Sequence, residues 1–276
     1  MTSEWRTIRA ADFIDFNPRL SLKKGDIATK VAMDKLKPFT KKIPETEKAE
    51  FNGGAKFCNG DTVMARITPC LENGKTAYVD MLDDGEIGFG STEFIVMRAK
   101  TGISDPQFVY YTAINPVFRN VAIKSMVGSS GRQRVQQSVL EELELSVPDL
   151  DEQRRIGDFL ARIDEKIALN DRINDNLLAQ AQTLYKQFFP YGVQDDLPDG
   201  WRIGTVGEII EIHDSKRIPL SGADRTKMEK KIYPYYGAAS LMDFVDNYIF
   251  DGKYLLLGED GTVVDDDRHC TLCPGN

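Results

Sequence analysis

The chain has 276 residues, which is enough for two domains of ordinary size. Its apolar fraction of 41% and charged fraction of 28% are typical of a globular protein. No apolar run approaches the ~20 residues of a membrane span, and the polar start of the chain is no signal peptide. Four cysteines are too few for a disulfide framework at this length, so we expect a cytoplasmic protein with no membrane partner.

The net charge of −8 argues at first against binding to nucleic acid. The charge is uneven, however: residues 1–148 hold 20 basic and 19 acidic residues, and the remainder holds 15 and 24. Between Lys23 and Lys75 there are 11 basic and 7 acidic residues, a local excess of +4. Because local potential matters more than the total, this stretch could bind phosphates, and the alternative is an ordinary solvated face.

Residues 1–148 carry the signals of a mixed α/β domain. Short β-like runs at 62–67 and 93–97 are bounded by turns rich in glycine and asparagine. A helix is predicted over residues 105–120, because Ser104, Asp105 and Pro106 are the residue types that open helices.

Residues 151–189 predict one long helix with a heptad seam. Asp149 or Asp151 can cap its start, and Pro190 with Gly192 ends it. At 1.5 Å per residue this helix is about 57 Å long. The seam positions alternate in steps of four and three: Ile156, Leu160, Ile163, Ile167, Asn170, Asn174, Leu177, Ala181, Leu184 and Phe188.

Two interpretations of the seam are open. The helix could pack on its own domain, but a strict 3.5-residue period over this length favours a partner helix. Asn170 and Asn174 lie in the middle of the seam, where buried asparagine costs stability but fixes register.

The segment after the helix resembles a restart of the first domain. Trp5 and Trp201 are the only tryptophans, and each is followed by arginine. The stretch from Phe57 has a counterpart from Phe250, with an offset of 193 residues against 196 at the tryptophans. Asn276 would then correspond to about position 80 of the first copy, and residues from about 268 show neither helical nor strand periodicity. We therefore expect a second domain of the same kind that is truncated, with an atypical tail.

Catalytic motifs are weak throughout the sequence. Residues 115–118 come close to the Asn-Pro-Pro-Phe motif of amino-methyltransferases, but valine stands third and no glycine-rich cofactor loop precedes them. Asp224 with residues 229–231 is a faint likeness to a nuclease carboxylate–lysine cluster. His269 with Cys270 and Cys273 offers only three ligands for a structural zinc. We expect no catalytic residue and no metal site, and a stand-alone DNA methyltransferase or nuclease is the rival hypothesis.

The order of domain, long helix and second domain resembles the DNA-specificity subunits of type I restriction–modification systems. Residues 148–156 look like the Pro-x-x-x-x-Gln-x-x-Ile opening of a conserved helix in that family. Residues 126–135 are similar to the segment that closes a target-recognition domain, and residues 197–201 to the start of a second one.

The resemblance implies an α/β (α+β) target-recognition domain at 1–148, a spacer helix at 149–190 and an incomplete second recognition domain at 191–276. It implies a non-catalytic reader of double-stranded DNA that positions methyltransferase subunits and a restriction/translocase subunit. S-adenosylmethionine, ATP and magnesium would bind those partners, with no cofactor in this chain. The alternative, suggested by the tail, is a truncated product without function.

Candidate contact residues follow from this interpretation. Lysine and arginine on loops suit phosphate anchoring, and the candidates are Lys35, Lys37, Lys41, Lys42, Arg66, Lys75, Arg132 and Arg134. A homodimer is also predicted, because the helix of a second copy could cover the apolar seam of residues 151–189.

Overall fold

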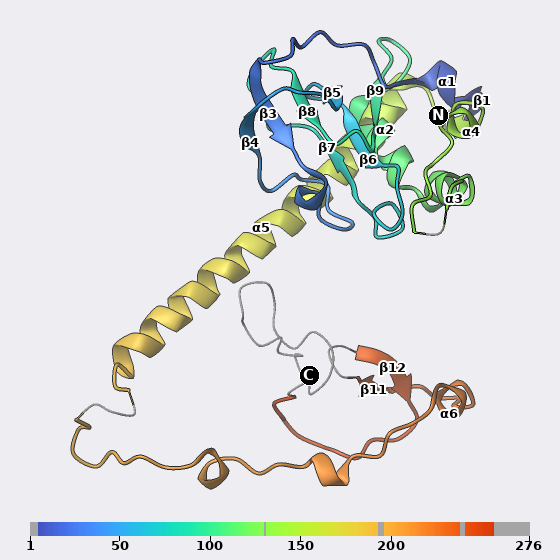
Figure 1. The fold of residues 1–276 in the computed structure, drawn as a ribbon. Coiled ribbons are helices and arrows are strands. Elements are labelled where there is room, and N and C mark those ends of the chain that lie inside the picture. Colours follow the sequence, from blue (N-terminus) through green and yellow to red (C-terminus); the bar gives the residue numbers. More distant parts are fainter. Residues whose placement is uncertain (1–4, 130, 193–195, 238–240, 257–276) are drawn as a thin grey trace. The chain divides into compact units, whose positions relative to one another are not determined.

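The computed structural model describes residues 5–129, 131–192, 196–237 and 241–256 (Figure 1). The chain divides into two units, Met1–Phe188 and Phe189–Asn276. The first unit holds a mixed α/β domain and the long helix, as the sequence predicts. No helix in the described ranges is both long and apolar enough to cross a membrane.

Two four-stranded sheets form the frame of the first unit. One has the order β2-β9-β6-β7, with strands Ile14–Phe16, Phe94–Ala99, Thr62–Ala65 and Thr76–Tyr78, and all its pairs are antiparallel. The other has the order β4-β3-β8-β5, with strands Glu47–Glu50, Ile27–Val31, Gly88–Gly90 and Ala55–Phe57, and its β3–β8 pair is parallel. β1 (Arg6–Arg9) and β10 (Glu144–Val147) form a separate antiparallel pair.

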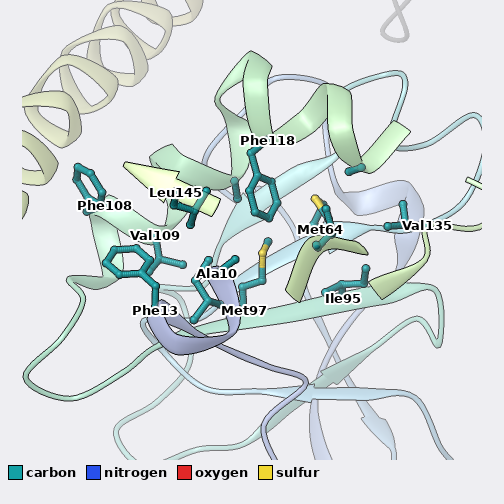
Figure 2. Packing of buried hydrophobic residues seen from close by; sticks show 14 of the residues in the cluster. Ala10, Phe13, Met64, Ile95, Met97, Phe108, Val109, Phe118, Val135 and Leu145 are labelled. Atoms are coloured by element: carbon teal, nitrogen blue, oxygen red, sulfur yellow. The ribbon is translucent and has the colours of Figure 1, made fainter. Parts of the chain in front are cut away.

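Strands β6 and β9 are buried on both faces and divide the core into two layers. Because successive side chains of a strand point to opposite faces, Met64 and Val63 enter different clusters. Met64, Ile95 and Met97 pack under α1 (Ala10–Phe13), α2 (Pro106–Ile114), α3 (Pro116–Lys124) and α4 (Gln137–Glu141). Figure 2 shows this helix-covered cluster, where Phe118 lies beside Met64 and Phe108 lies beside Phe13.

The helix predicted over residues 105–120 is in fact two helices, α2 and α3. Its start is confirmed, because the Asp105 side chain accepts a hydrogen bond from the Phe108 N–H at 2.9 Å. The break falls at Asn115, whose extended ψ of 134° is what a residue before proline prefers. Asn115 then caps α3 by accepting from the Val117 N–H at 2.8 Å.

Helix α5 spans Leu150–Phe188, a single run of 39 residues that confirms the predicted long helix. Of the two predicted caps, Asp149 is the one that accepts from a first-turn N–H, that of Glu152, at 2.8 Å. In Figure 1 the helix starts against α2 and then leaves the domain as a straight rod.

The second unit is sparse in regular structure. It contains two 3-10 turns (Val206–Glu208, Asp214–Lys216), α6 (Gly222–Thr226) and the antiparallel pair β11 (Tyr233–Tyr236) and β12 (Leu241–Val245). Val245 is the only buried apolar residue in its described part. Residues 250–256, the counterpart of the stretch from Phe57, contain no helix or strand, and residues from 257 onward lie outside the described residues.

Candidate nucleic-acid interface

Three loops that lie far apart in sequence meet at one edge of the β2-β9-β6-β7 sheet. We call residues 32–42, 66–75 and 125–136 together the three-loop surface. The Phe39 N–H donates to the Gly74 carbonyl at 3.0 Å, and the Thr68 N–H donates to the Gln133 carbonyl at 3.0 Å. The middle loop is therefore hydrogen-bonded to both of the others.

The turn after β6 is shaped by Gly74. This residue has φ +74°, a conformation that side-chain-bearing residues rarely adopt. A Cβ atom there would lie 2.6 Å from the ring of Phe39, so only glycine lets the first loop approach the second. Arg119 of α3 supports the same turn, because its guanidinium donates to the carbonyls of Leu71 and Glu72 at 3.3 and 2.5 Å.

The third loop folds back on the second. Arg134 forms antiparallel bridges with both Ile67 and Val127, and the Val135 N–H donates to the Arg66 carbonyl at 2.8 Å. Residue 130 in this loop lies outside the described residues. These contacts hold the backbone of the loop at Val127 and at residues 134–135.

Five of the eight predicted DNA-contact residues already have partners within the domain. Lys35 forms an ion pair with Glu45, and Arg134 forms one with Glu93 at 2.6 Å, which lowers the pKa of that carboxyl. The Lys41 ammonium group is largely enclosed by the rings of Tyr78, Tyr110 and Tyr111. The other two donate to main-chain carbonyls, Arg66 to Val135 and Lys75 to Met33.

The remaining three, Lys37, Lys42 and Arg132, are exposed, and no ion pair or hydrogen bond engages their side chains within the described ranges. Lys37 and Lys42 belong to the first loop and Arg132 to the third, so these two loops of the three-loop surface carry positive charge that no described acidic group pairs with. An anion could bind these three groups without breaking an internal contact.

Two exposed residues of the same surface were missed by the sequence reasoning. Phe39 is 75% exposed with φ +53°, a conformation that costs energy for an aromatic residue. Asn73 is exposed on the second loop. The available signal was an aromatic residue inside the lysine-rich stretch from Lys35 to Lys42, a combination typical of surfaces that bind nucleic acid.

The first turns of α5 are locked into the domain by Gln153 and Gly157. Gln153 is fully buried; it accepts from the Asp105 N–H at 3.1 Å and donates to the carbonyls of Ile103 and Pro148 at 3.2 and 3.0 Å. A Cβ atom on Gly157 would lie 2.9 Å from side-chain atoms of Asp105 and Gln107. The helix therefore passes close to the start of α2.

The seam residues fall into two groups. Ile156 and Leu160 are half-buried, and Ile156 packs against the helix-covered core. The other eight are exposed, with Ile163 at 43% and Phe188 at 67%: Ile163, Ile167, Asn170, Asn174, Leu177, Ala181, Leu184 and Phe188. Packing on the chain's own domain thus accounts for the start of the seam and leaves the rest uncovered.

No group of three His, Cys, Asp or Glu side chains in the described part of the chain could hold a metal ion. Cys58 and Cys70 are free thiols. His269, Cys270 and Cys273, the candidate zinc ligands, lie outside the described residues. Glu229, Lys230 and Lys231 each donate a main-chain N–H to the Asp246 carboxylate, so their backbone is held against β12.

Comparison with known proteins gives several matches. The chain is 34% identical over 126 residues to the EcoAI specificity subunit of Escherichia coli, which covers 46% of this chain and 21% of that protein. It is 31% identical over 134 residues to the HindI specificity subunit of Haemophilus influenzae, covering 47% of this chain and 28% of that protein. The chain therefore spans less than a third of the length of either of these two curated relatives.

Solved structures of two S subunits are similar at low identity. For the HsdS subunit of Thermoanaerobacter tengcongensis the identity is 21%, the TM-score 0.47 and the coverage 72% of this chain and 52% of that one. For the S subunit from M. genitalium the identity is 19% and the TM-score 0.46, and the match covers 89% of this chain and 63% of that one. The family model of the type I restriction modification DNA specificity domain matches residues 3–179, well over half of the sequence. The chain belongs to the type I restriction modification DNA specificity domain family.

Proposed function

We propose that this chain is a DNA-specificity subunit of a type I restriction–modification complex. The observation that carries the proposal is the family match over residues 3–179, which includes the whole three-loop surface. In this role the chain is not an enzyme: it recognises a DNA half-site and positions methyltransferase and restriction/translocase subunits. Those partners would bind S-adenosylmethionine, ATP and magnesium, and a cytoplasmic location remains a prediction.

Lys37, Lys42 and Arg132 are the phosphate contacts in this proposal. Each is exposed and free of internal partners among the described residues, so binding a phosphate costs only side-chain entropy and hydration. Lys35 and Arg134 would first have to leave Glu45 and Glu93. Phe39 and Asn73 offer a stacking face and an amide for base edges on the same surface.

The exposed half of α5 is the proposed assembly surface. At 100° per residue, Ile163, Ile167 and Leu177 project within one sector of the helix, and they are 43–56% exposed. We propose that the same helix from a second copy covers this stripe in an antiparallel arrangement. Asn170 and Asn174 would then lie near the two-fold axis, where their amides can pair with one another.

The energetics allow such a pair. Covering the five exposed large apolar side chains of the seam on each helix, Ile163, Ile167, Leu177, Leu184 and Phe188, at about 1.5–3 kcal/mol each gives roughly 8–15 kcal/mol per helix before entropy costs. Two identical domains would then stand at opposite ends, and the preferred target is a palindrome with a central gap. Helices of partner methyltransferase subunits are the alternative cover, and a chain that stays monomeric at micromolar concentration would point to them.

The test of the main proposal uses the purified full chain and duplex DNA. We expect binding that weakens steeply with salt, no methyl transfer and no cleavage by the chain alone, and site-specific methylation once methyltransferase subunits are added. Robust methyl transfer or cleavage by the chain alone would support the stand-alone enzyme instead. Failure to bind DNA both alone and with methyltransferase subunits would favour a product without function.

A further inference from the structure

Lys41, Tyr111 and Asp164 form a connected polar group between the domain and helix α5. The Lys41 ammonium donates to the Tyr111 hydroxyl at 2.9 Å, and that hydroxyl donates to the Asp164 carboxylate at 2.5 Å. Lys41 Nζ also lies 3.7 Å from the same carboxylate, and only 12% of its side chain is exposed.

Three tyrosine rings enclose the ammonium group. Lys41 Nζ lies 4.8 Å from the ring centre of Tyr111 and 5.4 Å from those of Tyr78 and Tyr110, distances typical of cation–π contacts. Burial lowers the pKa of Lys41, which reflects the cost of removing this charge from water. A methionine would fill the same space more cheaply, so the charged group suits a geometric role better than a purely stabilising one.

Lys41 also belongs to the first loop of the three-loop surface. Its side chain points into the tyrosine cluster while the next residue, Lys42, is exposed. Its carbonyl accepts from the Tyr78 N–H at 2.9 Å, which fixes the backbone at this point. One residue therefore connects the proposed DNA-contact loop, the β2-β9-β6-β7 sheet and α5.

Two polar attachments bracket the segment of α5 that packs on the domain, with the half-buried Ile156 and Leu160 between them. The first is the buried Gln153 with Gly157, and the second is Asp164, 11 residues or about 16 Å beyond Gln153. A rod held at one point can pivot, whereas a rod held at two points has a defined direction. From Leu169 to Phe188 every side chain is exposed.

The distance from Asp164 to the end of the helix makes its direction consequential. The helix continues for 24 residues to Phe188, or about 36 Å. A tilt of about 5° at Asp164 would move that end by about 3 Å, which is close to the 3.4 Å rise of one base pair.

We propose that Lys41, Tyr111 and Asp164 are positioning residues that set the direction of α5 relative to the three-loop surface. Resting on the proposed function, this group determines how sharply the distance between two DNA half-sites is defined. No contact between Asp164 and DNA is involved.

The test compares Asp164→Asn and Tyr111→Phe with the matched control Asp171→Asn, an exposed carboxylate on the same helix. Spin labels carried by non-natural residues replace Lys124 on α3 and Lys186 near the end of α5 in the full chain. The labelled chain is diluted into an excess of unlabelled chain, so that double electron–electron resonance measures the spread of the label distance within one copy. We expect the distribution to broaden at least two-fold in both test variants and to match the parent in the control.

The second measurement tests the link to DNA. Each unlabelled chain, at a concentration where sedimentation shows the antiparallel dimer proposed above, selects from a random 40-base-pair duplex library, and sequencing gives the gap between enriched half-sites. We expect one gap for the parent and for Asp171→Asn, and two or more neighbouring gaps for Asp164→Asn. Loss of folding alone would lower enrichment at every gap equally, and Tyr111→Phe provides a second variant that keeps the ring in place.

The outcomes separate this proposal from the proposed function. Unchanged label distances in both test variants would overturn the positioning role. Broadened distances with a gap as sharp as the parent's would overturn its effect on DNA spacing. If the parent enriches no DNA, the DNA-recognition function fails, while the label distances still decide whether these residues position the helix.

Discussion

The two halves of helix α5 carry one heptad pattern but lie in different surroundings. In the first half Gln153 and Gly157 are buried, and Ile156 packs on the core. In the second half every side chain from Leu169 to Phe188 is exposed, including Leu177 and Leu184. The comparison shows that a heptad pattern in the sequence predicts an apolar stripe along the whole helix. The pattern does not indicate which partner covers each part of that stripe.

Each half also uses a different kind of interaction. The anchored half is held by hydrogen bonds of specific geometry, such as those of Gln153, and by a glycine that permits close approach. The exposed half has only a broad apolar stripe with two asparagines in it. The first arrangement fixes the local geometry of the helix start, and the second is the kind of surface that another amphipathic helix can cover.

The largest expected effect concerns the exposed half. Replacing Ile167 and Leu177 with aspartate should abolish self-association, because an antiparallel pair would lose four buried apolar side chains, about 6–12 kcal/mol in gross terms. Sedimentation velocity at micromolar concentration measures the change from dimer to monomer. Arg172→Asp, on the opposite face of the helix, is the control and should remain dimeric. A wild-type chain that is already monomeric rules out self-pairing.

A smaller loss of stability is expected in the anchored half. Gln153→Leu removes the partner of the Asp105 N–H and of two carbonyls, and each unsatisfied buried group costs about 1–3 kcal/mol. We expect the free energy of unfolding of the first unit to fall by about 3 kcal/mol or more in urea titrations. Gln180→Leu, an exposed site in the other half, should change it by less than about 0.5 kcal/mol. Equal effects at the two sites would erase the distinction between the halves.

Much of the fold could be predicted because its signals are local. The start of α2 depends on Asp105 and Pro106, and α5 depends on a repeat that runs through it. The break between α2 and α3 was missed although Pro116 is in the sequence, because the apolar pattern continues across it. The parallel pairing of β3 with β8 joins residues nearly 60 positions apart, and no local pattern encodes it.

The candidate site could be predicted only in part for the same reason. A basic loop is visible in the sequence, but which cations are free depends on distant acids. Glu93 lies 41 residues from the arginine that it binds, and Asp164 lies 123 residues from Lys41. Lysines 41 and 42 are adjacent and chemically identical, yet one enters an aromatic cluster and the other is exposed.

The stability of the domain that anchors α5 should also depend on alkaline pH, because of the tyrosines around Lys41. Burial raises the pKa of Tyr78 to about 12, so this phenol stabilises the fold fully below pH 10 and its contribution is lost as the pH rises from 10 to 12. The loss is up to about 2–3 kcal/mol at 1.36 kcal/mol per pKa unit. Tyr78→Phe should flatten this part of the stability–pH curve. The pKa of Lys41 is shifted in the opposite direction, but that group is common to both chains and cancels in the comparison.

If Tyr78→Phe loses stability between pH 10 and 12 as steeply as the parent, the phenol of residue 78 does not govern the transition. Burial also raises the pKa values of Tyr110 and Tyr111, so the variant should retain part of the slope.

The smallest expected effect asks whether DNA contacts are confined to the domain that anchors the helix. Lys37→Ala, Lys42→Ala and Arg132→Ala should each reduce the slope of log K against log salt by about 0.9, the value for one phosphate contact on duplex DNA. Lys186→Ala, an exposed lysine at the far end of α5, should leave the slope unchanged. Lys35→Ala should fall between these limits, because DNA must compete with Glu45 for that ammonium group. Fluorescence anisotropy of a labelled duplex over 50–200 mM salt measures all five slopes.

A change at Lys186 as large as that at Lys42 would mean that DNA also contacts the exposed half of the helix. The division between a DNA-binding domain and an assembly helix would then no longer hold.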